Sequence, residues 1–145
     1  MRLLPAMALV LVCFSFAFAG TAGTLVDIPS IAGKDEASVA KALGKPTAAE
    51  KSKHGPKKTY KLVPDGEVEV VFIQGKADWI TVTPGPKTRP PFGPDALRAL
   101  GLPSAPPSFS SPAVLRWANT SGLLEVSIFP AGQSVGYWYV KTRTQ

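Results

Sequence analysis

The chain has one cysteine, Cys13, and one histidine, His54, among its 145 residues. Cys13 belongs to an apolar N-terminal run, so the rest of the chain has no thiol for a disulfide, for thiol catalysis or for a Cys/His metal site. A chain without disulfides must draw its stability from a packed core. The sequence also lacks a glycine-rich phosphate loop, a metal-ligand cluster and a nucleophile elbow.

Few residues remain that could catalyse a reaction. His54 is the only imidazole, and it lies in the basic segment KSKHGPKK with no carboxylate beside it to orient the ring. Glu67 and Glu69 form a close carboxylate pair, but they alternate with valines, which is typical of a solvated strand face. We therefore expect a protein that is not an enzyme and that has no catalytic residues, metal or cofactor.

The N-terminus has the pattern of a secretory signal peptide. Arg2 precedes an apolar run over residues 3–18, and Ala17 and Ala19 form an A-x-A cleavage pattern before Gly20. We expect residues 1–19 to be removed and the protein to be secreted or periplasmic, with no transmembrane span afterwards. Retention of the run as a membrane anchor stays open, although it is short for a bilayer core roughly 30 Å thick.

Residues 35–46, DEASVAKALGKP, have the pattern of a short helix. Asp35 suits the N-cap, Gly44 suits the left-handed position after the helix, and Pro46 prevents continuation. Thr47 and Glu50 have the spacing of a capping box, which predicts a second short helix in AAEKSKH.

Three strands are predicted next, in KTYKLV, EVEVVFI and ADWITV, joined by the turn segments PDG and QGK. Their alternation predicts an inward set that faces the helix. This set is Val68, Val70, Phe72, Ile80 and Val82.

The second half of the chain repeats this order. Residues 83–93 are rich in proline and predict an extended linker. PDALRALGLP then predicts a helix with Pro94 at its first position and Gly101 after its last. Strands are predicted in VLRWANT, LLEVSIF and VGYWYVKT.

The two halves also share sequence. ALGKPTA (42–48) resembles ALGLPSA (99–105), and at the same offset Tyr60 meets Trp117 and Gly75 meets Gly132. A one-residue deletion in the hairpin is required to match the next strand of the two halves, that is Val68, Val70 and Phe72 with Leu124, Val126 and Ile128. We predict an α+β fold: two pseudo-repeats, each a short helix and a three-stranded antiparallel meander, share one sheet with the helices on one face. The predicted divisions are a signal peptide (1–19), a first unit (20–82), a Pro-rich linker (83–93) and a second unit (94–145).

The helix exit LGxP, followed by Y…VEVVFIQGKADWITV, resembles the β-lactamase-inhibitor-like fold. That family includes the β-lactamase inhibitory proteins, and the SmpA/OmlA-type outer-membrane assembly lipoproteins have a similar layout. The resemblance implies two units joined into one concave sheet that grips a partner protein. Leu43, Gly44 and Pro46 carry the motif and imply fold rather than function.

The sheet face turned away from the helices is the first candidate site. Alternation places large apolar residues there, whereas a solvated face should be polar. In the second half the same argument turns Tyr137 and Tyr139 inward. We predict that this outer face binds a protein partner. The residues predicted for it are Val71, Ile73, Trp79, Phe129 and Trp138.

A basic loop is the alternative site. The formal net charge is +6, and the densest run of positive charge could contact anionic lipid or glycan in an envelope-associated structural role. Nucleic acid is not expected, because no outward aromatic residue is interleaved and the protein is expected to be exported. The lysines of this cluster are Lys51, Lys53, Lys57, Lys58 and Lys61.

Overall fold

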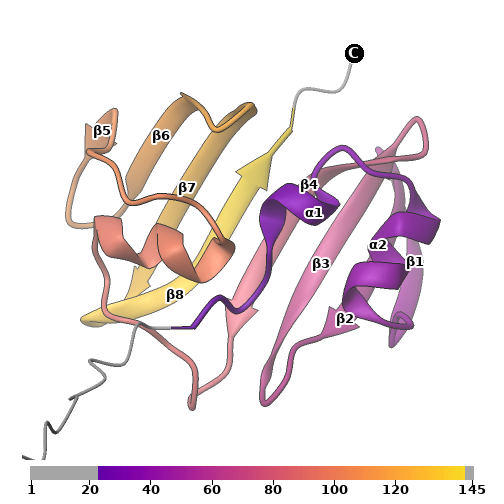
Figure 1. Ribbon diagram of the computed structural model, residues 1–145, viewed down its shortest axis with the longest axis horizontal. Helices are drawn as coiled ribbons and strands as arrows, with labels where there is room; N and C mark the ends of the chain where they lie inside the picture. The colour runs from indigo at the N-terminus through magenta and orange to yellow at the C-terminus, as the bar shows by residue number, and fades with distance from the viewer. Residues whose placement is uncertain (1–22, 143–145) are drawn as a thin grey trace, which may run out of the picture.

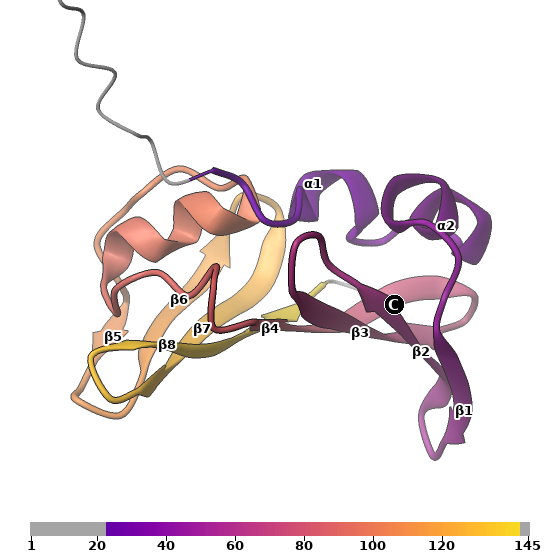
Figure 2. The ribbon, with the colours of Figure 1, turned by 90° about the horizontal axis from the view of Figure 1, so that it is seen from below.

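One open antiparallel sheet of eight strands forms the body of the protein, and helices lie along one of its faces (Figures 1 and 2). The computed structural model describes residues 23–142, so the predicted signal peptide lies outside the described residues. The helices are α1 (Ile28–Ile31), α2 (Glu36–Leu43) and the 3₁₀ helix η1 (Pro94–Leu100). The strands are β1 (Ala48–Ser52), β2 (Gly55–Lys61), β3 (Gly66–Ile73), β4 (Lys76–Pro84), β5 (Phe109–Ser110), β6 (Leu115–Thr120), β7 (Leu123–Ala131) and β8 (Ser134–Lys141).

The strand order is β1-β2-β3-β4-β8-β7-β6-β5. Two runs of four consecutive strands therefore meet where β4 pairs with β8, from Trp79 opposite Lys141 to Val82 opposite Trp138. The α+β class is as predicted. Each half has four strands rather than the three predicted, because β1 and the two-residue β5 add a strand at each edge.

Helix α2 begins and ends where the sequence predicts. The Asp35 carboxylate accepts a hydrogen bond from the Ser38 backbone N–H at 2.8 Å, and this bond lowers the pKa of Asp35. Gly44 follows the last helical residue with φ 87°, a conformation that favours glycine. The preceding short helix α1 was not predicted, and it buries Ile28 and Ile31 against the sheet.

The helix predicted after Thr47 is wrong, because residues 48–52 form strand β1. Its five residues pair with β2, from Ala48 opposite Thr59 to Ser52 opposite Gly55. A helix of this length is marginal on its own, since most of its backbone groups would have no intrahelical partner. Pairing with β2 satisfies those groups instead.

Helix η1 covers the second half of the sheet. It buries Ala96, Leu97, Ala99 and Leu100 and ends at Gly101 with φ 72°, so both glycines predicted to follow a helix have positive φ. The core lies between the helices and the sheet, and the predicted inward side chains of β3 and β4 belong to it. Those side chains, Val68, Val70, Phe72, Ile80 and Val82, are each at most 1% exposed.

Each half of the sheet contains one β-bulge. In the first, Val71 pairs with Trp79 and Phe72 with Ala77, so Asp78 is the extra residue. In the second, Phe129 pairs with Tyr137 and Pro130 with Val135, so Gly136 is the extra residue. A bulge reverses the alternation of side chains along its strand, and this decides which residues reach the outer face.

Candidate functional site: the outer face of the sheet

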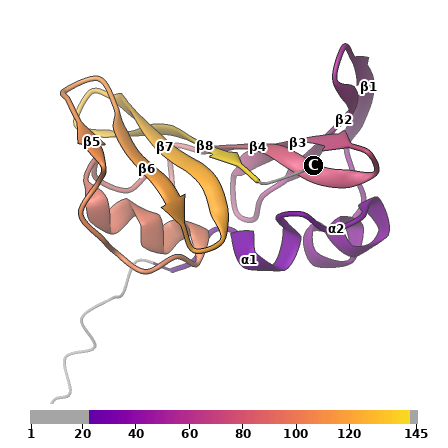
Figure 3. The same cartoon turned by 90° about the horizontal axis from the view of Figure 1, so that it is seen from above.

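The outer face is the side of the sheet turned away from α1, α2 and η1. Figures 2 and 3 show these helices on one side only, with the β1–β2 hairpin bending toward the other side. The outer face is formed by alternate residues of the strands, since the others point into the core.

In the first half of the chain, Trp79 lies at the centre of the outer face. Trp79 pairs across the strands with Val71, and its ring lies 4.4 Å from the His54 ring, centroid to centroid. The Lys141 Nζ lies 5.4 Å from the Trp79 ring centroid, within the range of a cation–π contact. The Trp79 Nε1 is buried and has no hydrogen-bond acceptor among residues 23–142.

The predicted outward orientation of Trp138 is wrong. Trp138 is 0% exposed, and its Nε1 donates to the Ala96 carbonyl of η1 at 3.1 Å. The reason is the bulge at Gly136: Val135 points into the core, but the extra residue reverses the alternation beyond it. Trp138 and Val140 therefore join the core.

The same reversal brings Tyr137 and Tyr139 to the outer face, contrary to prediction. Tyr137 is 40% exposed and stacks on Phe129, with ring centroids 4.6 Å apart and planes 16° apart. Tyr139 lies between Thr81 of β4 and Ser127 of β7. Burial raises the pKa of Tyr139, and the charges of Glu125 and Asp78 add to this rise.

The charged side chains of the outer face are largely paired with one another. Lys57 lies 2.5 Å from Glu50 and 3.9 Å from Glu69, and the hydrogen bond to Glu50 raises the pKa of Lys57. In the second half, the Arg116 Nε lies 3.3 Å from Glu125. The outer face thus presents aromatic groups with little excess charge of either sign.

Lys141 joins the two halves at the centre of the sheet. Its Nζ donates to the Asp78 Oδ2 at 2.5 Å, and Thr142 donates its hydroxyl to the Asp78 Oδ1 at 2.8 Å. Asp78 is 0% exposed, whereas the Lys141 side chain is 24% exposed. A carboxylate buried to this extent depends on such partners.

The basic cluster does not present five free charges. Lys58 pairs with Glu36 at 2.6 Å, and this hydrogen bond raises the pKa of Lys58, while Lys57 is paired as described above. Lys61 lies opposite Glu67 on β3. Lys51 and Lys53 remain exposed near the β1–β2 turn.

Sequence reasoning missed His54, Tyr137, Tyr139 and Lys141 on the outer face. The glycine in VGYWYVKT was the available signal for Tyr137 and Tyr139, because an isolated glycine within a strand pattern often marks a bulge. The contacts of His54 and Lys141 with Trp79 depend on tertiary structure and have no local signal.

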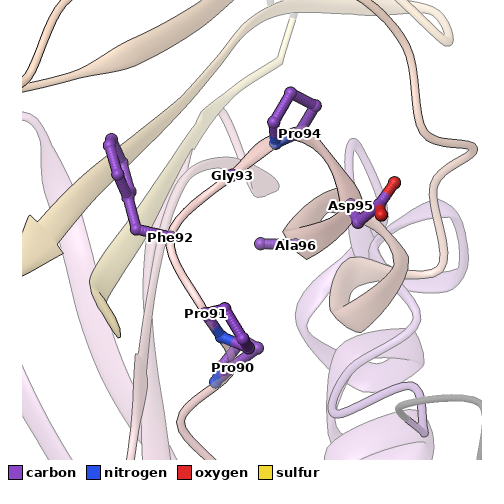
Figure 4. Close-up of a pocket in the computed structure, with 7 residues that line it drawn as sticks. All are labelled: Pro90, Pro91, Phe92, Gly93, Pro94, Asp95 and Ala96. Carbon is purple, nitrogen blue, oxygen red and sulfur yellow. The ribbon is translucent and has the colours of Figure 1, made fainter. Parts of the chain in front are cut away.

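Within residues 23–142, no group of three or more His, Cys, Asp or Glu side chains could hold a metal ion. A hollow of about 530 Å³ lies along residues 90–96 (Figure 4), and its only charged residue, Asp95, accepts a hydrogen bond from Ser104. None of the helices in this range is long and apolar enough to cross a membrane.

Comparison with protein-family models, curated proteins and solved structures gives no match. The resemblance to the β-lactamase-inhibitor-like fold therefore stays a prediction.

Proposed function

We propose that this is an exported, non-enzymatic protein that binds a partner protein through the outer face of its sheet. The observation that carries the proposal is the contrast between the two faces. Helices cover one face, whereas the half-buried Trp79 and the Phe129–Tyr137 stack lie on the other, which no helix of residues 23–142 covers. Tyrosine and tryptophan dominate the binding energy of protein interfaces, and exposed apolar patches of this kind often mark them.

Because the charged side chains of the outer face are paired with one another, a partner protein need not carry a strong charge to bind there. Lys57, Arg116 and Lys141 each have a carboxylate within the same face.

We also infer that the two halves are copies of one unit. Each half has helical structure, α1 and α2 in the first half and η1 in the second, followed by four consecutive strands with a bulge beside the last hairpin. The bulges at Asp78 and Gly136 match Val68 with Val126 rather than with Leu124, so the one-residue difference between the halves is an insertion, not a deletion. Two units joined at β4 and β8 would give an outer face wider than that of either unit alone.

Substituting Trp79 by alanine is expected to weaken the partner complex by about thirtyfold or more, the effect of an interface hot spot of about 2 kcal/mol. Trp79 is only partly buried, so the loss of stability should be much smaller than for a core tryptophan. Purified wild-type and variant chains, immobilised at equal density, would be compared for retention of proteins from the envelope fraction of the cells that produce them.

Leu124→Ala is the matched control. Leu124 is 42% exposed, similar to Tyr137, but it has the strand parity of the inward residues Val126 and Ile128. The proposal requires that Leu124→Ala retain the partner that Trp79→Ala loses. Equal retention by both variants would place the interface elsewhere.

A further inference from the structure

Three segments distant in sequence meet at the end of the molecule where the described chain begins. In Figure 1 they are the start of the chain, the β2–β3 connection and the segment between β4 and η1, all at the lower end of the view. They line one hollow of about 480 Å³. Its lining includes Gly23, Val63, Lys87 and Arg89.

Val63 gives this end an exposed apolar tip. It is 88% exposed, the largest exposure among the large hydrophobic residues of the described chain, while the neighbouring Leu62 is 5% exposed. Pro64 follows it directly, and proline restricts the backbone of both residues. Val63 is therefore held out into solvent, where burial against an apolar phase would be favourable.

Two unpaired cations flank this tip. Lys87 and Arg89 are exposed, and neither forms an ion pair within residues 23–142. The nearby Asp65 is half-buried, and its carboxylate accepts hydrogen bonds from the Lys87 backbone N–H and the Thr88 hydroxyl, both at 2.9 Å.

The remaining charges at the neighbouring strand ends offset each other, because Lys61 of β2 lies opposite Glu67 of β3. Lys87 and Arg89 are thus the side chains available to an anionic ligand.

The chain outside the described residues joins the molecule at this same end. Gly23 lines the hollow, and the apolar run of residues 3–18 precedes it closely. Residues 19–22 span at most roughly 14 Å when fully extended. Any passage of that run through a bilayer brings Val63, Lys87 and Arg89 to the bilayer surface before the rest of the fold.

We propose that this end of the molecule, formed by Val63, Lys87 and Arg89, docks on an anionic phospholipid surface. Val63 enters the head-group region, and the two cations contact lipid phosphates. This surface differs from the basic β1–β2 turn, where Lys51 and Lys53 are not accompanied by any of the exposed large hydrophobic residues. Docking by the loop end leaves the outer face of the sheet free, and it does not depend on the proposed partner.

The test measures the partition of the protein, produced from the complete gene and processed by the cell, onto phosphatidylcholine vesicles with and without phosphatidylglycerol. The readout is the partition coefficient on vesicles with phosphatidylglycerol divided by that on vesicles without it. A retained apolar segment would raise both coefficients by the same factor, so its contribution cancels in this ratio. Each cation near an anionic surface contributes about fivefold. Lys87→Gln with Arg89→Gln should therefore lower the ratio by roughly thirtyfold at low salt.

Lys51→Gln with Lys53→Gln is the matched control, since it removes the same charge at the other end of the sheet and should leave the ratio nearly unchanged. Val63→Ser should lower partition onto both kinds of vesicle. All substituted side chains are exposed, and circular dichroism would verify folding. The proposal is overturned if the Lys87/Arg89 variant keeps the wild-type ratio, or if the Lys51/Lys53 variant loses it instead.

Discussion

Trp138→Ala is expected to lower the free energy of unfolding by about 3–5 kcal/mol, the range for truncating a fully buried aromatic side chain. Trp138 is the largest fully buried side chain of the described chain and lies between the sheet and η1. Its removal leaves a cavity and also leaves the Ala96 carbonyl without the indole N–H. Equilibrium denaturation in urea measures this loss.

The adjacent residue supplies the control for Trp138. Tyr137→Ala should cost much less, because the Tyr137 ring is 40% exposed and contacts mainly Phe129. Trp138→Phe should be intermediate, since it keeps most of the volume but loses the hydrogen bond to Ala96. A Trp138→Ala variant as stable as Tyr137→Ala would mean that the bulge at Gly136 is wrongly placed.

Lys141→Met is expected to be about as destabilising, by about 3–5 kcal/mol, because it removes the cation that lies 2.5 Å from the fully buried Asp78 carboxylate. Asp78→Asn should cost less. The Lys141 side chain is 24% exposed, so its ammonium can then be hydrated, and the asparagine amide can still accept a hydrogen bond from Thr142. The free energies of unfolding of both variants would be measured in urea at neutral pH.

The double variant separates the ion pair from packing. Lys141→Met combined with Asp78→Asn should recover part of the stability lost by Lys141→Met alone, since no buried charge then remains unpaired. Lys61→Met, at an exposed lysine on β2, should have little effect. Additive losses in the double variant would show that the pair does not join β4 to β8 energetically.

The sequence predicts most of this fold because its local signals agree with one another. Asp35, Gly44 and Gly101 mark helix ends that the structure reproduces, and the alternation in β3 predicts its buried face. It fails at β1, where the capping-box pattern of Thr47 and Glu50 competes with pairing to β2. Tertiary pairing overrides a weak local preference there.

The candidate site could be predicted only in part. Trp79 lies on the outer face as alternation indicates, but one inserted residue, Gly136, exchanges Trp138 for Tyr137 on that face. The two faces of β8 are both aromatic, so hydrophobicity gives no independent check on the register. His54 lies in the β1–β2 turn, far from Trp79 in sequence, and no local pattern predicts the contact between their rings.

Site-specific photo-crosslinking in the producing cells tests the proposed partner binding most directly. A photoreactive phenylalanine would replace Thr81 on the outer face or Ala42, an exposed residue of α2 on the helix side. The account predicts a discrete crosslinked species from position 81 that disappears when Trp79→Ala is added, and none from position 42. The same species from position 42 with none from position 81 would contradict it.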